Sequence, residues 1–269
     1  YPGDNISYSV TTEKNFLEDI SFFNFNEYDV VVVCDLNLQE DEIKIVDYKN
    51  VVVLDHHAEH IERLHLYKNA KAIVKDYTSC AKLIHDVLKL NQKNLSDNQK
   101  LLIKIVDDYD SYQLKIPYSK QLNQIFWSYT GDRVAKFVKD FGNGFFGFNE
   151  FQKNALKIIE NKIERFFKEE TIHVGELKLG GKNYKIAGVF VTFSPNEIAE
   201  RIIKEHDIDF VLMINLNAKN VYLRKNVKCT LDMGNLANKL MDGGGHEDAA
   251  GGKLNDTIIN ITKFLKPIQ

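Results

Sequence analysis

The feature that most constrains the fold is a pair of short apolar runs rich in β-branched residues, at positions 30–34 and 51–54. An acidic amphipathic stretch at positions 40–48 separates them. Continuous apolar runs of this length are typical of strands buried on both faces, and a helix between two such strands predicts a βαβ unit. We therefore expect an α/β fold built on a parallel sheet.

Each apolar run ends in an aspartate, Asp35 after the first and Asp55 after the second, and His56 and His57 follow Asp55. The carboxyl ends of parallel strands line the ligand crevice of such sheets, so both acids should meet there. Carboxylates with imidazole favour Mn²⁺, with Mg²⁺ as the alternative cation. A lone strand-end aspartate more often caps a turn, but two of them with paired histidines favour half of a metal site.

The two adjacent histidines are expected to do different work. Successive residues of a strand point to opposite faces, although both rings can face the crevice if the chain turns after Asp55. The simplest division makes His56 a metal ligand through a neutral nitrogen. His57 then contacts a phosphate or assists the leaving group.

A third acidic motif, Asp107-Asp108-Tyr109-Asp110, follows a helix predicted at positions 97–106. Three carboxylates within four residues repel one another unless a cation or open water relieves the charge. One of them is therefore a candidate ligand. The others are explained by a solvated helix end, and Asp110 alternatively caps the turn that follows.

The second half of the chain differs in texture. A glycine-punctuated bend at positions 142–147 precedes a long charged amphipathic stretch at 149–170, which predicts a helix that joins two domains. Short predicted strands and two helices follow it. We expect a domain at residues 1–148, a linker helix at 149–170 and a smaller α/β domain at 171–269. The net charge changes from −6 over residues 1–130 to +2 over residues 171–269, which suits a cation in the first part and an anion in the last.

The segment around Gly243, Gly244, Gly245 and His246 is the second functional signal. Successive glycines allow positive φ angles and let the backbone approach a ligand, so we expect an anion-binding nest with His246 at its edge. Arg224 is a candidate phosphate ligand because its guanidinium is a planar fork, whereas Lys225 and Lys228 are interpreted as surface charges. The remaining histidines are interpreted as ordinary surface or helix residues: His60, His65, His85, His173 and His206.

Composition excludes several classes of protein. The 269 residues are 44% hydrophobic and 27% charged, which suits two globular domains. No stretch approaches the roughly 20 apolar residues of a membrane span, and no leader resembles a signal peptide, so we expect a cytoplasmic protein without a membrane partner. Three cysteines without CxxC spacing predict neither a disulfide framework nor a zinc site. The net charge of −3 argues against a protein that holds long duplex nucleic acid.

In order along the chain, these motifs resemble the DHH phosphoesterase superfamily, specifically its RecJ-like branch with a DHH-associated C-terminal domain, the branch of nano-RNases and oligoribonucleases. The resemblance covers nearly the whole chain. It is carried by Asp35 after its strand, by Asp55-His56-His57, by Asp107-Asp108 and by Gly243-Gly244-Gly245-His246 with Ala249-Ala250-Gly251.

The resemblance implies a parallel-sheet metal-binding domain, a linker helix and a substrate-binding domain, with the active site in the cleft between the domains. It implies that Asp35 bridges two cations and that His56 and Asp108 complete one of them. It also implies that Asp55 supports the histidines. Arg224 and the glycine segment with His246 would bind the phosphate or sugar end of the substrate.

One motif of the family is missing from this chain. The His-x-Asp-x-Asp-Gly segment that ends the family's first strand has no substitute before Asp35. Because the sequence starts at Tyr1 rather than Met, we expect that an N-terminal piece is absent; true loss of one metal site is the alternative.

The resulting functional hypothesis is a Mn²⁺-dependent phosphodiesterase or exonuclease that cleaves short single-stranded oligonucleotides or dinucleotides to nucleoside monophosphates, using water activated by two metals. Two alternatives stay open: a phosphatase of polyphosphate or small phosphomonoesters, and a non-catalytic phosphate or nucleotide sensor that lacks one metal site. Polarity, the choice between RNA and DNA, and the oligomeric state, a homodimer included, stay open as well.

Overall fold

The computed structural model describes residues 6–11, 15–88 and 95–267. The chain divides into two compact units, which we call the first unit (residues 1–152) and the second unit (residues 153–269). Each unit has a sheet and a hydrophobic core of its own, as expected for an α/β chain of this length. The predicted first domain ended at residue 148, and the predicted linker at 149–170 falls almost wholly within the second unit. The assignment of domains and linker stays a prediction.

The first unit contains a parallel sheet in the order β1-β2-β3. Strands β1 (Val31–Cys34), β2 (Val51–Asp55) and β3 (Lys71–Val74) run side by side, with Val31 opposite Val51 and Asp55 opposite Val74. Helix α2 (Glu40–Val46) crosses between β1 and β2, so the predicted βαβ unit is present. The carboxyl ends of β1 and β2 therefore lie at the same edge of the sheet.

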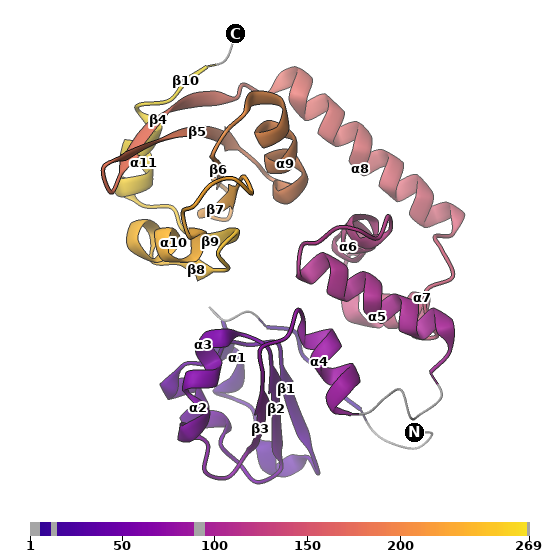
Figure 1. Ribbon diagram of the computed structural model, residues 1–269. Helices are drawn as coiled ribbons and strands as arrows, with labels where there is room; N and C mark the ends of the chain where they lie inside the picture. Colours follow the sequence, from indigo (N-terminus) through magenta and orange to yellow (C-terminus); the bar gives the residue numbers. More distant parts are fainter. Residues whose placement is uncertain (1–5, 12–14, 89–94, 268–269) are drawn as a thin grey trace. The chain divides into compact units, whose positions relative to one another are not determined.

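Helices cover both faces of this sheet (Figure 1). On one face, Val33, Val51 and Val53 pack with Ile43 and Val46 of α2. On the other face, Leu54 packs with residues of α4 (Cys80–Val87). Burial on both faces explains why β2 reads as an uninterrupted apolar run.

Short elements complete this layer and lead into three further helices. The short ones are α1 (Phe16–Ile20), η1 (Phe25–Glu27), α3 (Ala58–Glu62) and η2 (Leu64–Leu66). The helices that follow are α5 (Asp97–Asp110), α6 (Ser119–Ser128) and α7 (Arg133–Phe141). Ser96 begins α5 with a capping box that includes Gln99, and α5 extends four residues past the predicted end at position 106. All three acids of the Asp107–Asp110 motif therefore belong to a helix.

The second unit is built on a seven-stranded mixed sheet in the order β10-β4-β5-β6-β7-β9-β8. Its strands are β4 (His173–Leu179), β5 (Lys182–Phe190), β6 (Phe210–Asn215), β7 (Asn220–Lys225), β8 (Gly244–Gly245), β9 (Ala249–Lys253) and β10 (Lys266–Pro267). Among the described strands of this second sheet, only β5 and β6 pair in parallel; its other pairs are antiparallel.

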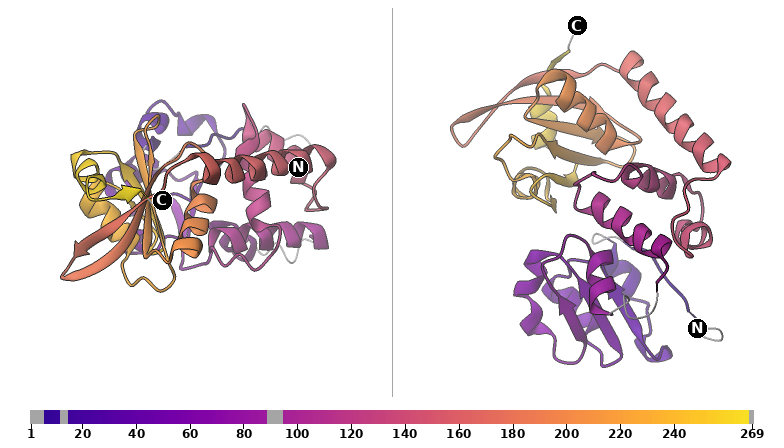
Figure 2. Two further views of the ribbon diagram at one scale, coloured as in Figure 1. Left: turned by 90° about the horizontal axis from the view of Figure 1, so that it is seen from above. Right: turned by 45° about the vertical axis from the view of Figure 1, so that its right-hand side comes forward.

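Both faces of the second sheet are buried, and Figure 2 shows helices on either side of it. Helix α9 (Pro195–His206) packs on one face through Ile198 and Ile202. Helices α10 (Met233–Met241) and α11 (Asp256–Thr262) pack on the other, where Met233 and Ile258 contact the sheet residues. This double covering accounts for the continuous apolar run at positions 210–214 of β6.

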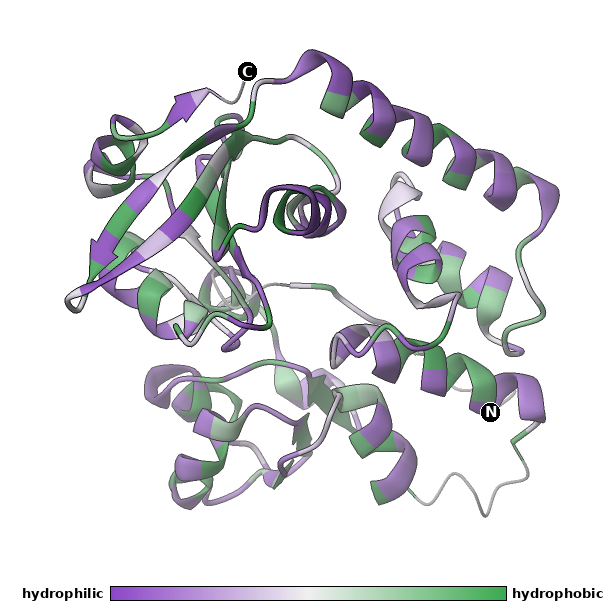
Figure 3. Ribbon diagram, turned by 45° about the horizontal axis from the view of Figure 1, so that its top comes forward, coloured by the Kyte–Doolittle hydropathy of each residue, from purple (hydrophilic) through white to green (hydrophobic). Residues whose placement is uncertain are grey.

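Helix α8 (Glu150–Glu169) corresponds to the predicted charged helix at positions 149–170. All but its first three residues belong to the second unit, where Phe166 joins the core beneath α9. The rest of the helix is mainly hydrophilic (Figure 3). Its role as a linker stays a prediction. No described helix combines the length and hydrophobicity required to cross a membrane.

Candidate metal and phosphate site

The site begins where β1 ends. Asp35 follows β1 directly and has a φ angle of 61°, in the left-handed region that aspartate tolerates better than most residues. Its amide N–H still donates to the carbonyl of Leu54, at 3.0 Å. A backbone held in this region by its neighbours costs energy and is characteristic of functional sites.

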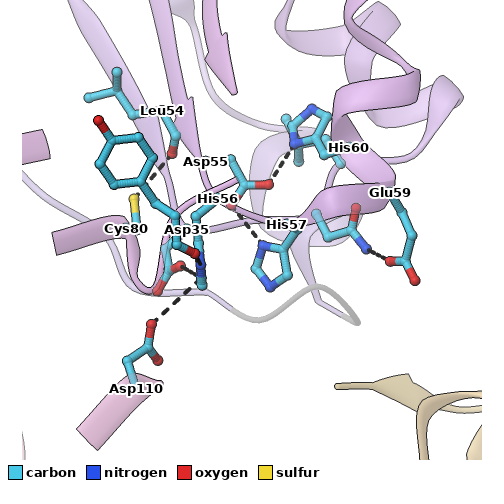
Figure 4. Close-up of polar contacts among 12 residues, drawn as sticks. Asp35, Leu54, Asp55, His56, His57, Glu59, His60, Cys80 and Asp110 are labelled. Atoms are coloured by element: carbon cyan, nitrogen blue, oxygen red, sulfur yellow. Dashed lines mark hydrogen bonds and ion pairs between the residues drawn. The ribbon is translucent and has the colours of Figure 1, made fainter. Parts of the chain in front are cut away.

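Asp35, His56 and His57 lie together at the carboxyl edge of the parallel sheet (Figure 4). One ligand atom from each of the three side chains lies within 4.8 Å of the others. The closest of these contacts joins His56 Nε2 to Asp35 Oδ1, at 3.3 Å. The structure thus brings together three of the residues that the sequence predicted for the site.

His56 is held by a backbone carbonyl. Its Nδ1 lies 3.1 Å from the carbonyl oxygen of Tyr77, so that nitrogen donates and Nε2 is directed toward Asp35. In a neutral ring the Nε2 lone pair would meet a carboxylate oxygen, a repulsive arrangement unless a proton or a cation lies between them. Burial alone would lower the pKa of His56, but the contacts with Asp35 and Tyr77 raise it to about 9.

Asp55 supports the histidines from behind. It is fully buried, and its two carboxylate oxygens each lie 2.7 Å from an imidazole Nδ1, Oδ1 from that of His57 and Oδ2 from that of His60. Burial alone would raise the pKa of Asp55, but the hydrogen bonds from the two rings lower it to about 2. Asp55 is therefore a buried carboxylate between two donors.

The three acids of the Asp107–Asp110 motif have separate environments because successive residues of a helix point about 100° apart. Asp107 accepts from the hydroxyls of Thr78 and Ser79. Asp108 is 8% exposed and accepts from the backbone N–H of Lys115 and of Ile116 and from the Ser119 hydroxyl. Asp110 alone of the three is recorded near the cluster, with Oδ2 3.6 Å from His56 Nε2.

The structure therefore favours Asp110, rather than the predicted Asp108, as the acid that α5 contributes. The reason is that the helix extends to residue 110, which turns Asp108 toward the segment 115–119. Loss of hydration and the charge of Asp35 raise the pKa of Asp110 to about 6. Two acids beside one imidazole form an arrangement that a divalent cation would relieve.

The donor set fits a divalent cation of intermediate softness. It offers two imidazole nitrogens and two partly exposed carboxylates, which match the preferences of Mn²⁺, with Mg²⁺ as the harder alternative. The hydrogen bonds of His56 to Tyr77 and of His57 to Asp55 are of the kind that orient metal-binding histidines. Among the described residues before Asp35, none joins the Asp35–His56–His57 set.

The glycine segment of the second unit forms a short hairpin instead of a run of positive φ angles. Of Gly243, Gly244 and Gly245, only Gly245 has a positive φ, of 143°. A Cβ on Gly243 would lie 2.0 Å from the Gly251 carbonyl oxygen, whereas a Cβ on Gly244 would meet nothing within 4 Å. The predicted nest of three glycines is therefore corrected: close packing of β8 on β9 requires Gly243, and Gly244 has the open face.

His246 and Arg224 lie on different parts of this hairpin region. His246 is exposed in the turn between β8 and β9, where its amide N–H donates to the carbonyl of Ala249, at 2.8 Å. Arg224 is buried in β7 opposite Ala249.

The next residue, Lys225, is 8% exposed, and its Nζ lies 2.7 Å from Glu247 Oε1 and 3.1 Å from Asp248 Oδ1. The interpretation of Lys225 as a surface charge was wrong, because the side chain is buried. Its two ion pairs join β7 to the turn that carries His246.

Sequence reasoning missed His60 and Tyr67. His60 was interpreted as an ordinary residue, yet it is fully buried and bonded to Asp55, and its Nε2 lies 2.8 Å from the Tyr67 hydroxyl. A signal was present, because His57 and His60 are three residues apart and the first turn of α3 brings them to one side. Nothing in the sequence around Tyr67 pointed to the site.

The chain matches no family model and no curated protein. It is similar to three solved structures with functional names. An exopolyphosphatase-related protein from Bacteroides fragilis is 14% identical, with 94% of this chain and 71% of that chain covered and a TM-score of 0.46. The pGpG-specific phosphodiesterase PggH from Vibrio cholerae is 12% identical, with 92% and 90% covered and a TM-score of 0.48.

A putative family II inorganic pyrophosphatase from Methanococcus jannaschii is 13% identical, with 92% and 84% covered and a TM-score of 0.27. All three names refer to phosphate-bond hydrolysis, and they are the names of those proteins. With TM-scores below 0.5, these likenesses do not decide the function.

Proposed function

We propose that this chain is a metal-dependent phosphoesterase of the DHH type, and that it hydrolyses short oligonucleotides or dinucleotides to nucleoside monophosphates. The observation that carries the proposal is the 3.3 Å approach of His56 Nε2 to Asp35 Oδ1 at the ends of two neighbouring parallel strands. Polar groups gathered at the carboxyl ends of parallel strands are where α/β proteins bind their ligands.

Asp35 and His56 would hold a divalent cation, and Asp110 takes the place that the sequence gave to Asp108. A bound Mn²⁺ or Mg²⁺ supplies Lewis acidity that neutralises phosphate charge and lowers the pKa of water. Asp110 suits this place because burial and repulsion from Asp35 raise its pKa, and a cation offsets that repulsion. The bridging of two cations by Asp35 stays a prediction, since it requires ligands beyond the described set.

His57 is the proposed contact for the scissile phosphate. Its Nδ1 donates to Asp55, so Nε2 is the ring atom that can act on a substrate. Burial alone would lower the pKa of His57, but the bond to Asp55 and its charge raise it. A protonated Nε2 can donate to a phosphate oxygen and then to the leaving oxygen.

The substrate class follows from charge and size. With a net charge of −3, the protein lacks the strong positive field that long nucleic acid requires. The second unit is proposed to bind the terminal phosphate or sugar through the β8–β9 hairpin, where Gly244 is open and His246 is exposed. The predicted cytoplasmic location and a homodimer stay predictions.

The experiment is product analysis of the full chain with labelled di- and oligonucleotides, cyclic dinucleotides and polyphosphate, each with Mn²⁺, with Mg²⁺ and with a chelator. The proposal expects Mn²⁺-stimulated release of nucleoside monophosphates. Release of orthophosphate from polyphosphate instead would establish the phosphatase alternative. Mn²⁺ binding measured by electron paramagnetic resonance, with no hydrolysis of any substrate, would favour the sensor that lacks one metal site.

A further inference from the structure

A continuous chain of hydrogen bonds runs from the interior of the first unit to the site. The Tyr67 hydroxyl lies 2.8 Å from His60 Nε2, His60 Nδ1 lies 2.7 Å from Asp55 Oδ2, and His57 Nδ1 lies 2.7 Å from Asp55 Oδ1. His60 and Asp55 are both fully buried. Figure 4 shows His60 and His57 on opposite sides of the Asp55 carboxylate.

In this series of hydrogen bonds, the donors to Asp55 can be assigned without ambiguity. An ionised carboxylate only accepts, so both imidazole Nδ1 atoms must carry protons. Nε2 of His60 then faces the Tyr67 hydroxyl, which donates to that nitrogen when it carries no proton. Burial raises the pKa of Tyr67, which keeps the hydroxyl protonated for that role.

The consequence concerns the orientation of His57. A carboxylate held at one oxygen only can rotate about its Cβ–Cγ bond and lengthen its bond to His57. Because His60 holds the second oxygen, Asp55 is fixed at both ends and His57 keeps Nε2 as its outward nitrogen. Orientation by such outer hydrogen bonds is what makes a histidine a reliable ligand or acid.

We propose that His60 and Tyr67 are positioning residues that fix the ring of His57 through Asp55. The catalytic consequence rests on the proposed function, whereas the positioning does not. A purely structural role accounts poorly for the pattern. If packing were the only requirement, apolar side chains at positions 55 and 60 would fill the same space without a buried charge.

The test measures His57 itself in the metal-free full chain. Nuclear magnetic resonance with ¹⁵N-labelled histidine reports which ring nitrogen carries the proton and how fast that proton exchanges with water. In His60→Leu we expect exchange of the His57 Nδ1 proton to be about tenfold faster, the factor that corresponds to one lost hydrogen bond. In Tyr67→Phe we expect a smaller increase of about threefold, because the bond lost is one step further from His57.

His60→Asn is the rescue variant. An asparagine side-chain nitrogen can occupy the position of Nδ1 and donate to Asp55, so exchange should stay within about twofold of the natural protein. Should His60→Leu fail to fold, Tyr67→Phe and His60→Asn still carry the comparison. The proposal would be overturned if His57 kept its tautomer and its proton exchange rate in a folded His60→Leu protein. If His60→Leu does not fold, the same result in Tyr67→Phe would overturn it.

Matched controls come from the same unit. His85→Leu removes another buried histidine whose Nδ1 lies near a carboxylate, 2.8 Å from Asp86 Oδ1. Tyr129→Phe removes another buried hydroxyl, which donates to Asp140. Neither control should alter the His57 signals, and an equal effect in them would show general destabilisation and overturn the assignment.

Activity provides the second readout. We expect kcat to fall about 10- to 100-fold in His60→Leu with little change in KM, and to recover in His60→Asn. If the natural protein hydrolyses no phosphoester, the proposed function fails, while the His57 signals still decide the positioning role.

Discussion

The candidate sites of the two units differ in what forms them: side chains in the first unit and backbone in the second. In the first unit, side chains from the ends of β1 and β2 and from the end of α5 converge on one point. In the second unit, the hairpin of β8 and β9 is shaped by backbone contacts, with Gly243 pressed against Gly251. Side chains of a given chemistry are therefore a better guide to function than glycines, which serve packing as readily as ligands.

The largest expected effect tests the side-chain site. Asp35→Asn should reduce Mn²⁺-stimulated hydrolysis by more than the roughly 10- to 100-fold typical of outer hydrogen-bond partners, because it removes a proposed ligand. His56→Ala should do the same, with the fold preserved in circular dichroism. Asp41→Asn is the control, since Asp41 is exposed and pairs with Lys44. Unchanged turnover in Asp35→Asn would remove the basis of the proposal.

The next effect separates two acids on one helix. Asp110→Asn should weaken Mn²⁺ binding by more than about tenfold, the lower end of the effect of losing an outer hydrogen-bond partner, with little change in stability, since its side chain is 41% exposed. Asp108→Asn should instead lower the free energy of unfolding by about 1–3 kcal/mol, because the buried carboxylate accepts three hydrogen bonds. Electron paramagnetic resonance and urea denaturation measure the two quantities. The reverse pattern would restore Asp108 as the ligand.

A third test addresses the hairpin. Gly243→Ala should lower the free energy of unfolding by about 1–3 kcal/mol, because the added Cβ would lie 2.0 Å from a carbonyl oxygen. Gly244→Ala should change stability by less than about 0.5 kcal/mol, since it faces open space. If Gly244→Ala also leaves KM unchanged, the hairpin backbone does not approach the substrate.

The fourth effect is a pH dependence of stability. Asp55 has a pKa lowered to about 2, so its contribution is present above the unfolded value and is lost as the pH falls from about 4 to about 2. The expected loss is about 2 kcal/mol, measured as the urea midpoint across this range. In Asp55→Asn this part of the pH dependence should disappear. A wild-type midpoint that does not change over this pH range would argue against an ionised buried Asp55.

The smallest effect concerns the exposed imidazole of the hairpin. His246→Ala should raise KM by less than about tenfold and leave kcat unchanged, because an exposed contact with phosphate is screened by water. The measurement is steady-state hydrolysis of a dinucleotide. An unaltered KM would count against His246 as a substrate contact and would strengthen the contrast between the two units.

Local patterns predicted most elements of the fold. The apolar runs before Asp35 and Asp55 are β1 and β2, and the parallel register that places their ends together follows from the helix between them. The site was predicted less completely. The end of α5 was placed at residue 106, and those four residues decide which acid reaches His56, since each residue turns the side chain by about 100°.

The sequence by itself determined which side chains reach the edge of the first sheet, because a strand that ends in Asp55-His56-His57 brings a carboxylate and two imidazoles to that edge wherever the sheet forms. Only the tertiary structure decided which of the acids and histidines lie together at the candidate site. Contacts between residues remote in sequence place His56 between the Tyr77 carbonyl and Asp110, and Asp107 against Thr78. Such contacts depend on distances that no local pattern encodes, since packing of separate elements sets them to within a fraction of an ångström.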